Sequence, residues 1–316
     1  MKNTRDRVLV LGGNGFIGSH IVNSLIRNDY RVRVFDRFKD LSETQFNGRK
    51  NIEVVSGDFL NEDDIGESLD DVDYVIHAIS TTDPVISENN PLFDIETNVK
   101  GSVELFSQIV NSGGVKRVVF LSSGGTVYGD NHYGRPINEL DPTWPISPYG
   151  IGKLTIENYL HYFDKKYGQK YSVFRISNIY GEGQAKIKKQ GIIPIFSNKI
   201  RNGEDVTVYG DGSMVRDYIY VKDVADLIAI SLSKQLEHSV YNLGSGVGHS
   251  VNKIISVIES VAGKKASIVH RATPSTYVES SILDISRIKK EFPNMKLTDI
   301  GDGIAKVYKS ECASER

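Results

Sequence analysis

The chain has 316 residues, of which 39% are hydrophobic and 25% are charged. This ordinary globular mix excludes disordered and collagen-like proteins, and the length suits one large α/β domain or two domains. A formal net charge of −2 provides no basic surface for nucleic acid or for anionic lipid.

Cysteine content and the N-terminus indicate the compartment. The single cysteine, Cys312, allows no intrachain disulfide and no cysteine-based zinc cluster, which is typical of a cytoplasmic protein. The charged N-terminal residues are followed by an apolar run of only 8–11, too short for a signal peptide or a membrane span. We therefore expect a soluble, cytoplasmic protein that binds neither nucleic acid nor membrane.

The first half of the chain alternates short apolar runs with amphipathic stretches. The runs that we predict as strands are 8–11, 32–35, 52–55, 74–76, 118–121 and 172–176. The stretches with helical spacing of apolar residues are 16–28, 98–111 and 148–167. Strands that alternate with helices predict βαβ units and an α/β fold with a Rossmann-like, doubly wound parallel sheet.

Beyond about residue 175 the pattern changes. Glycines, prolines and short segments dominate 179–212, and helices are predicted at 221–234 and 252–262. We expect a cofactor domain over residues 1–175 and a smaller α/β substrate domain over residues 176–316. No flexible linker separates them, so they should pack closely, and segments of chain can return from one to the other.

A glycine-rich turn joins the first strand to the first helix. Gly12, Gly15 and Gly18 follow the spacing G-x-x-G-x-x-G. Glycine lets the backbone approach a pyrophosphate, while the helix N-terminus at Phe16 and Ile17 supplies N–H groups and a partial positive charge. The alternative is a plain turn, but its place directly after a strand favours a dinucleotide site.

Carboxylates after the next two strands indicate which dinucleotide binds. Asp36 ends the second strand, where a carboxylate can accept the ribose hydroxyls of NAD and repel the 2′-phosphate of NADP. The neighbouring Arg37 could instead attract that phosphate, so NAD is favoured but NADP stays open. Asp58 and the Phe59 backbone could hydrogen-bond the adenine; the alternative for Asp58 is a helix N-cap.

Tyr149 and Lys153 stand four residues apart in the third helical stretch and so share one face. An ammonium beside a phenol stabilises the phenolate and lowers the tyrosine pKa from about 10. Such a tyrosine can remove or return an alcohol proton, which suits hydride transfer to a nicotinamide. The pair alone could be an exposed helix face, but with the glycine turn upstream it predicts an active site.

Together these motifs resemble the extended short-chain dehydrogenase/reductase family, in its nucleotide-sugar epimerase and dehydratase branch, and within it UDP-hexose 4-epimerases. The matching segments are 12–18, 57–58, Asn98, 122–129, 147–149 with Lys153, 175–181, 209–212 and 216–219. They extend over nearly the whole chain, so the resemblance implies the fold, the cofactor and the catalytic residues of that branch.

The resemblance implies a role for each matching residue. The residues implied for NAD are Gly12, Gly15, Phe16, Ile17, Gly18, Asp36, Arg37, Asp58, Phe59, Asn98 and Lys153. Tyr149 would be the acid/base, and Asn178 and Arg216 would hold the substrate diphosphate, where a guanidinium suits phosphate oxygens. The alternative for Arg216 is an ion pair with Asp217 or Asp211. Tyr209 would lie near the uracil.

One departure from the family concerns the hydroxyl that hydrogen-bonds the reacting sugar oxygen. The family carries it on a serine or threonine at the position of Gly124. Losing an oriented donor can cost about 2–4 kcal/mol of barrier. We therefore expect Ser123 or Thr126 to replace it. The alternatives are that Tyr149 acts without it, or that both hydroxyls only cap the turn.

A second departure concerns the substrate. The family's second phosphate-binding arginine falls on Pro274, and its following aspartate falls on Tyr277. A loop shift could bring the nearest arginine, Arg271, to the substrate diphosphate; the alternative is that this role is lost. The same count places Ser281 where the family sets the room beside the sugar 2-substituent. A small residue there implies that N-acetylhexosamines fit as well as hexoses.

The resemblance thus predicts NAD-dependent 4-epimerisation of UDP-Glc/UDP-Gal, and of UDP-GlcNAc/UDP-GalNAc if Ser281 leaves room, through a transient 4-keto sugar and without a metal. The main alternative, kept open by Gly124 and Pro274, is an NAD(P)H-dependent reductase of a nucleotide-linked 4-keto-6-deoxy sugar. A 4,6-dehydratase would need an Asp-Glu pair within 123–127, and a non-enzymatic NAD sensor would not need Tyr149 and Lys153.

By family association we also expect a homodimer, formed through helices 98–111 and 148–167, and a role in polysaccharide biosynthesis.

Overall fold

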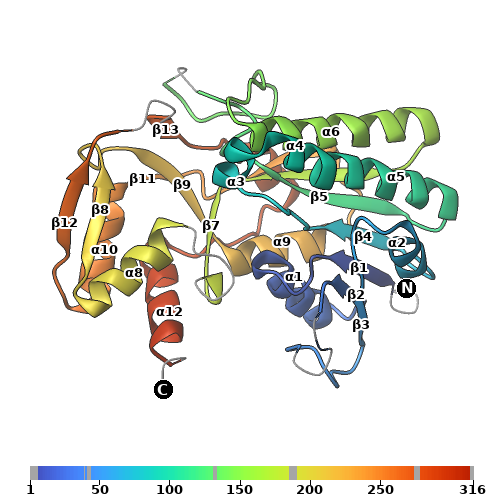
Figure 1. The fold of residues 1–316 in the computed structure, drawn as a ribbon, viewed down its shortest axis with the longest axis horizontal. Coiled ribbons are helices and arrows are strands. Elements are labelled where there is room, and N and C mark those ends of the chain that lie inside the picture. The colour runs from blue at the N-terminus through green and yellow to red at the C-terminus, as the bar shows by residue number, and fades with distance from the viewer. Residues whose placement is uncertain are drawn as a thin grey trace.

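A seven-stranded parallel sheet forms the centre of the larger part of the molecule (Figure 1). The computed structural model describes residues 6–38, 40, 44–130, 134–184, 191–273 and 278–313. In sheet order the strands are β10 (Val240–Leu243), β6 (Tyr171–Ile176), β5 (Arg117–Ser123), β4 (Tyr74–His77), β1 (Arg7–Leu11), β2 (Arg31–Asp36) and β3 (Ile52–Ser56), all paired in parallel. This confirms the predicted doubly wound, Rossmann-like sheet.

Helices cover both faces of this sheet. On one face lie α1 (Phe16–Arg27) and α9 (Val221–Ser231), and on the other lie α2 (Glu62–Ser68), α5 (Gly101–Ser112) and α6 (Pro148–Tyr167). The apolar positions at helical spacing, such as Ile21 and Leu25 of α1 and Ile156 and Leu160 of α6, are buried against the strands. Before α5, the chain forms α3 (Pro84–Asn89), α4 (Pro91–Asp94) and the π-helical turn η2 (Ile95–Lys100).

The smaller part is built around β9 (Val215–Tyr220), which pairs with β7 (Asn178–Tyr180), β11 (Gly248–Ser250) and β13 (Ser280–Ser281). A separate pair joins β8 (Asp205–Tyr209) to β12 (Ser267–Arg271). Helices α8 (Ile192–Asn202), α10 (Val251–Ala262) and α12 (Ile300–Ala313) pack around a core of their own, and α11 (Ser286–Glu291) packs near β10.

Helix α8 was not predicted, because only short segments were expected in 179–212. Gly191 and Pro194 are typical helix breakers in a sequence. Here Gly191 is the N-cap and Pro194 lies in the first turn, where a missing N–H costs no helical hydrogen bond. The helix is held by its buried apolar side, which includes Ile193, Phe196 and Ile200.

The two parts are joined by more than one passage of the chain. Helix α9 and strand β10 both follow residue 175, but α9 packs beside α1 and β10 completes the large sheet. The division of the chain at residue 175 into a cofactor domain and a substrate domain therefore stays a prediction about what each part binds. Pro274, Tyr277 and the basic run 186–189 lie outside the described residues.

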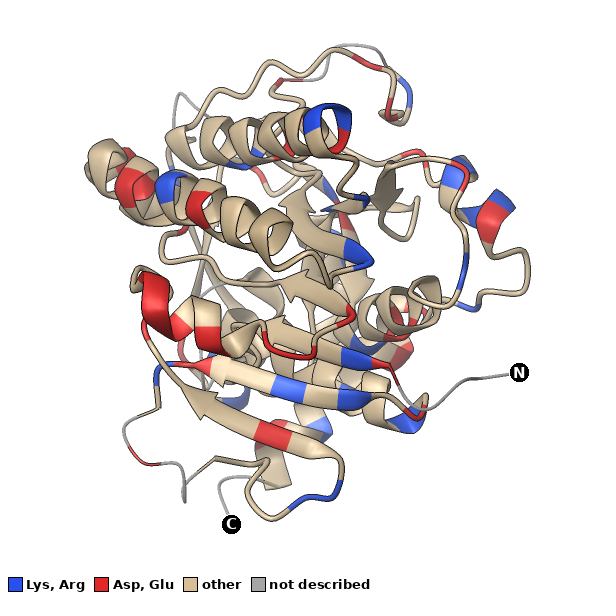
Figure 2. Ribbon diagram, turned by 90° about the vertical axis from the view of Figure 1, so that its right-hand side faces the viewer, with Lys and Arg blue, Asp and Glu red and all other residues tan. Residues whose placement is uncertain are grey.

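Charge is spread over the surface. Lys and Arg are interspersed with Asp and Glu on the face drawn in Figure 2, in keeping with the net charge of −2. Among the described residues, no helix is long and apolar enough to cross a membrane.

A buried ion pair fixes helix α6 to the sheet. The Glu157 Oε2 atom lies 2.7 Å from Nη2 of Arg175 on β6, with side chains only 5% and 8% exposed. Ser122 donates to Glu157 Oε1, and Arg175 Nη1 donates to the Tyr128 hydroxyl over 2.9 Å. Because Glu157 stands four residues after Lys153, this pair sets which face of α6 meets the sheet.

Breaking this pair should destabilise the protein strongly. In Glu157→Gln, Arg175 stays buried without its anion, so we expect the free energy of unfolding to fall by about 3–5 kcal/mol in urea denaturation. The matched control is Glu237→Gln, whose pair with Lys290 has side chains 59% and 74% exposed. That variant should stay within about 0.5 kcal/mol of wild type. Similar losses in both variants would contradict the role of Glu157.

Candidate active site

A cavity of about 630 Å³ opens at the carboxyl ends of the sheet strands, between the two parts of the molecule. Its walls are the turn after β1, the ends of β4 and β5, the start of α6, and residues of β7, α8 and β9. The strand order reverses between β1 and β4, and ligands of open α/β sheets bind at this kind of switch point. The volume is that of a small-molecule site.

Many of the predicted residues meet in this cavity. Those that line it are Gly12, Gly15, Phe16, Ile17, Gly18, Asp36, Ser123, Thr126, Tyr149, Lys153, Asn178 and Arg216. Those that lie outside its wall are Arg37, Asp58, Phe59, Asn98, Tyr209, Arg271 and Ser281. The fold thus brings the glycine turn, the Tyr149–Lys153 pair and two candidate diphosphate ligands to one place, while the role of each residue stays a prediction.

The glycine turn has no room for side chains. Gly12 adopts a left-handed φ of +78°, and a Cβ atom on Gly18 would collide with the Gly12 carbonyl oxygen. Helix α1 starts directly after Gly15 with no side-chain cap and no acidic residue in its first turn. The N-terminus of α1 is therefore a site for an anionic group that approaches the backbone closely.

Three charged residues meet at the end of β2. Asp36 accepts the backbone N–H groups of Asn14 and Arg37, each over 2.9 Å, and burial raises its pKa. The Arg37 Nη2 atom lies 2.7 Å from Asp58 Oδ1. The pKa of Asp58 is lowered by the backbone N–H of Leu60 and by Arg37. Arg37, the residue that could attract an NADP phosphate, is thus held by Asp58.

The N-cap alternative for Asp58 is wrong. Helix α2 begins after Asn61, whose side chain accepts the N–H groups of Asp63 and Asp64. The Asp58 carboxylate instead accepts from Arg37 and Leu60, one turn earlier in the chain.

Asn98 and Phe59 support the cavity from behind its wall. Asn98 donates to Thr82 Oγ1 and Asp94 Oδ1 and accepts the Thr81 N–H over 2.9 Å, so it holds the loop after β4. The Phe59 ring is buried, 5.3 Å from the ring of His77. A contact of either residue with NAD stays a prediction.

Tyr149 and Lys153 lie together on α6, as predicted. The Lys153 Nζ atom is 5.5 Å from the centroid of the Tyr149 ring and 4.9 Å from that of Phe120, and it donates to the Leu121 carbonyl over 3.2 Å. The prediction of a Tyr149 pKa below about 10 is wrong for the protein chain itself, in which the net shift is upward. Burial raises the pKa of Tyr149 to about 12, against the opposing effect of a hydrogen bond with Ser80.

Gly124 is closed off from the cavity. A Cβ atom there would lie 2.6 Å from Cδ1 of Leu283 and 3.0 Å from the Arg175 carbonyl oxygen, so a serine or threonine would require Leu283 to move. Ser123 and Thr126 do line the cavity, and among the described residues the buried Thr126 Oγ1 has no hydrogen-bond partner. Ser80 also lines the cavity and was not predicted, since no motif marks the loop that follows β4.

The predicted substrate residues occupy β7 and β9. Asn178 donates to the Asp217 carbonyl over 3.1 Å, and Arg216 donates to the carbonyls of Val215 and Val278. The Asp217 carboxylate accepts from Ser177, Ser245, Gly246 and Leu283, so it is occupied by other donors.

The remaining predicted residues lie next to these strands. Ser281 is buried on β13 and is the register partner of Arg216. Arg271 and Tyr209 are register partners on the β12–β8 pair, farther from the cavity. The structure therefore groups Arg271 with Tyr209, and neither lines the cavity.

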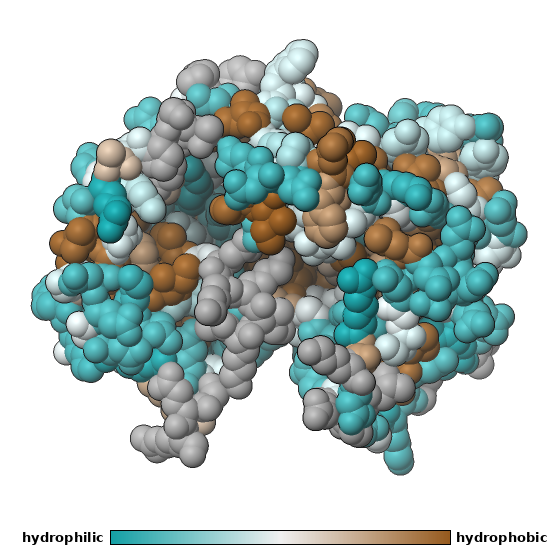
Figure 3. Space-filling view, in the orientation of Figure 1, coloured by the Kyte–Doolittle hydropathy of each residue, from teal (hydrophilic) through white to brown (hydrophobic). Residues whose placement is uncertain are grey.

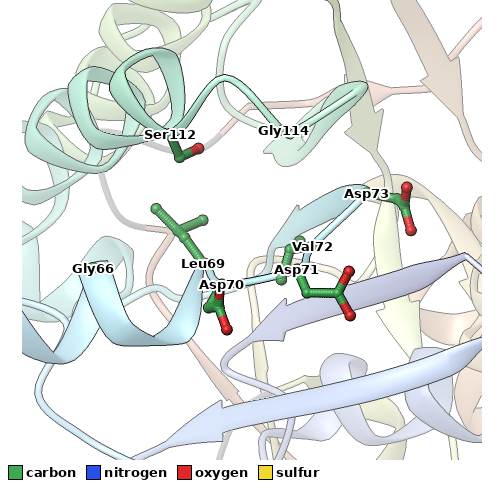
Figure 4. Close-up of a pocket in the computed structure, with 8 residues that line it drawn as sticks. All are labelled: Gly66, Leu69, Asp70, Asp71, Val72, Asp73, Ser112 and Gly114. Atoms are coloured by element: carbon green, nitrogen blue, oxygen red, sulfur yellow. The ribbon is translucent and has the colours of Figure 1, made fainter.

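A second cavity, of about 350 Å³, lies between the end of α2, the start of β4 and the end of α5 (Figure 4). Two of its carboxylates are paired: Asp73 lies 2.8 Å from Lys116, and Asp71 lies 3.4 Å from Arg7 and 3.5 Å from Arg31. Within the described ranges, no group of three or more His, Cys, Asp or Glu could hold a metal ion. The candidate active site is therefore the larger cavity.

Comparison with known proteins identifies the family of the chain. Residues 8–244 match the family described as the NAD dependent epimerase/dehydratase family. A UDP-glucose 4-epimerase from Thermotoga maritima, solved with UDP-glucose, is 33% identical with a TM-score of 0.89, and the match covers 98% of this chain and 100% of that one. A UDP-N-acetylglucosamine 4-epimerase from Methanobrevibacter ruminantium, solved with UDP-N-acetylmuramic acid, is 30% identical with a TM-score of 0.88, covering 98% and 99%. A dTDP-4-dehydro-6-deoxyglucose reductase of Escherichia coli is 34% identical over 98% of this chain and 99% of the relative.

The Arg37–Asp58 pair gives a test of cofactor choice. In Asp58→Asn, Arg37 loses its anion and can meet a 2′-phosphate, so we expect NADP to bind about threefold to fivefold more tightly, as measured by calorimetric titration. The estimate corresponds to about 1 kcal/mol, the upper value for an exposed pair. The double variant Asp58→Asn/Arg37→Ala is the control and should lose this gain. Weaker NAD binding with unchanged NADP binding would show instead that Asp58 only contacts adenine.

Proposed function

The chain belongs to the NAD-dependent epimerase/dehydratase family, and we propose that it is a UDP-sugar 4-epimerase that works through a transient 4-keto sugar. The observation that carries the proposal is the meeting of Tyr149 and Lys153 with the glycine turn and with Asn178 and Arg216 in one cavity. Two structures that are 33% and 30% identical and nearly equal in length are UDP-sugar 4-epimerases.

The cavity fits NAD. The turn that excludes side chains at Gly18, together with the uncapped start of α1, suits a pyrophosphate, and the fixed carboxylate of Asp36 suits the adenosine ribose. We assign adenine to Asp58 and Phe59, and the nicotinamide ribose to Lys153. When bound, NAD supplies a reversible hydride acceptor and the positive charge of its nicotinamide ring.

Tyr149 moves the proton in the proposed reaction. As the phenolate it accepts the proton of the sugar 4-hydroxyl, and as the phenol it returns a proton to the keto oxygen after the sugar has turned its other face toward the cofactor site. With a pKa of about 12 in the protein chain, the phenol holds its proton near neutral pH. Positive charge in the cavity, from Lys153 and from the cofactor, favours the phenolate.

Asn178 and Arg216 anchor the substrate in this proposal. Both line the cavity on the side opposite α6, where they can hold the diphosphate while the keto sugar turns. We assign the uracil to Tyr209 and place Arg271 beside it as a second contact for the nucleotide. The small, buried Ser281 beside Arg216 is consistent with room for an N-acetyl group.

The second candidate is a net reductase of a nucleotide-linked 4-keto-6-deoxy sugar. It is favoured by the Escherichia coli reductase, which is 34% identical, and by the absence of a hydroxyl at Gly124. Such a reaction would use Tyr149 as the acid and would consume reduced cofactor.

Turnover without added nucleotide separates the two candidates. The purified protein should interconvert UDP-Glc with UDP-Gal, and UDP-GlcNAc with UDP-GalNAc, with no NAD(P)H consumed. Tyr149→Phe should lower kcat by about 10²–10⁴ because the proton has no acceptor. Consumption of NAD(P)H by a 4-keto substrate, one for one, would instead support the reductase. Activity on UDP-Glc but none on UDP-GlcNAc would contradict the role of Ser281.

We also propose a homodimer formed through α5 and α6. Large hydrophobic side chains are exposed on α3, α4, η2 and α6: Val85, Ile86, Leu92, Phe93, Ile95, Ile151, Tyr159 and Tyr162. Figure 3 shows hydrophobic surface over the part of the molecule where Figure 1 places α3 and α4. Exposed apolar patches of this kind mark protein interfaces.

A charge on this surface should break the dimer. Tyr159→Glu should halve the mass measured by light scattering, since it places a carboxylate in an apolar interface. The control is Ile268→Glu, which carries the same charge on the exposed face of β12 and should leave the mass unchanged. A wild-type protein that is monomeric at micromolar concentration would contradict the proposal.

A further inference from the structure

A side chain of α1 holds the chain that leaves β7. The Nε2 atom of His20 lies 2.9 Å from the Glu182 carbonyl oxygen, and since a carbonyl oxygen can only accept, the imidazole N–H donates. Burial lowers the pKa of His20, so the ring is uncharged near neutral pH and donates its single N–H here. His20 stands one turn after Phe16, so this bond starts from the helix whose N-terminus faces the proposed pyrophosphate site.

Residues 178–184, here called the β7 segment, form part of the substrate side of the cavity. The members of this segment that line the cavity are Asn178, Ile179, Tyr180 and Gln184. At Gly181 the backbone passes so close to α9 that a Cβ atom would collide with Val221, and the same atom would lie 3.6 Å from Cζ of Phe16. Helix α1 therefore meets the β7 segment at two successive residues, Gly181 and Glu182 (Figure 1).

Glu182 is held by its side chain as well as by its backbone. Its carboxylate accepts the Tyr220 hydroxyl over 2.6 Å and lies 2.8 Å from Nζ of Lys222 on α9. The ring of the buried Tyr220 lies 5.8 Å from that of Tyr180, which lines the cavity. Because β9 and α9 fix the carboxylate, the bond from His20 sets where the Glu182 backbone lies relative to α1.

Other polar side chains of α1 serve a different contact. Ser24 and Arg27 both donate to the Asp226 carboxylate, which fixes α1 to α9 within the larger part of the molecule. The bond of His20 instead reaches from α1 to the wall on which we place the substrate diphosphate.

We propose that His20 is a positioning residue through which NAD at the start of α1 orders the β7 segment for the substrate; this rests on the proposed places of NAD and of the UDP-sugar. The first turn of α1 is held when its free N–H groups bind a pyrophosphate. His20, one turn further along, then keeps Glu182, and with it Asn178 and Gln184, in a fixed position relative to that turn. By linkage, a ligand on the β7 segment favours NAD binding by the same factor as NAD favours that ligand.

Two substitutions separate the hydrogen bond from the bulk of the ring. His20→Phe keeps a ring beside Phe16 but has no N–H to donate, and His20→Gln keeps an N–H donor on a side chain of similar length. The control is Arg27→Ala on the same helix, which removes the pair with Asp226, whose side chains are 56% and 55% exposed.

Hydrogen exchange measures the order of the β7 segment without any substrate. In wild type, loading with NAD should slow exchange of the amides in 178–184. In His20→Phe this slowing should shrink by about twofold to tenfold, the range for one hydrogen bond, and it should return in His20→Gln. Arg27→Ala should match wild type. A purely structural role would change exchange equally with and without NAD, which would leave the effect of NAD intact and overturn the proposal.

Nucleotide binding gives a second readout. In NAD-loaded His20→Phe, the Kd of UDP and the KM of the UDP-sugar should rise about twofold to tenfold with kcat unchanged, and His20→Gln should restore both. A wild-type protein that does not bind UDP would reject the proposed function, while the exchange experiment would still decide the role of His20. The proposal would be overturned by an effect of NAD on exchange that is absent in wild type, or that Arg27→Ala loses as fully as His20→Phe.

Discussion

The buried carboxylate of Asp217 is the contact on which the geometry of the cavity depends. It is fully buried on β9 and accepts hydrogen bonds from Ser177, Ser245, Gly246 and Leu283. These donors follow β6, β10 and β13, so one side chain joins the edge of the large sheet to the centre of the smaller part. Adjacent strand residues point to opposite sides, and Arg216 therefore faces the cavity while Asp217 faces the core.

Helix α6, which forms another wall of the cavity, is also held in place by a buried carboxylate. Tyr149, Lys153 and Glu157 are spaced four residues apart and share one face. The buried pair of Glu157 with Arg175 fixes that face against the sheet, and Lys153 and Tyr149 then lie at the end of β5. The site is thus positioned by two buried carboxylates, one in each part, each fully engaged with its own donors.

This arrangement also explains how a nearly neutral chain can hold two anionic ligands. In the proposed function, backbone N–H groups at α1 and a few placed cations would do the binding, and the carboxylates Asp36 and Asp58 lie beside Arg37 at the end assigned to the adenosine. Burial has the opposite effect at the proposed reaction centre, where it raises the pKa of Tyr149 to about 12. The Tyr-x-x-x-Lys spacing alone therefore does not produce a phenolate in the protein chain.

The sequence by itself determined strands β1 to β6 of the large sheet, helices α1, α5, α6 and α9, the glycine turn and the Tyr149–Lys153 spacing, because each depends on local spacing and periodicity; it did not reveal β10 or α2. It did not reveal α8, whose Gly191 and Pro194 look like breakers until the apolar side of the helix is buried. Only the tertiary structure decided that Leu283 fills the space beside Gly124 and that Asp58 holds Arg37. These contacts join residues far apart in the chain, and their energies depend on burial and on distance, which no local pattern of residues encodes.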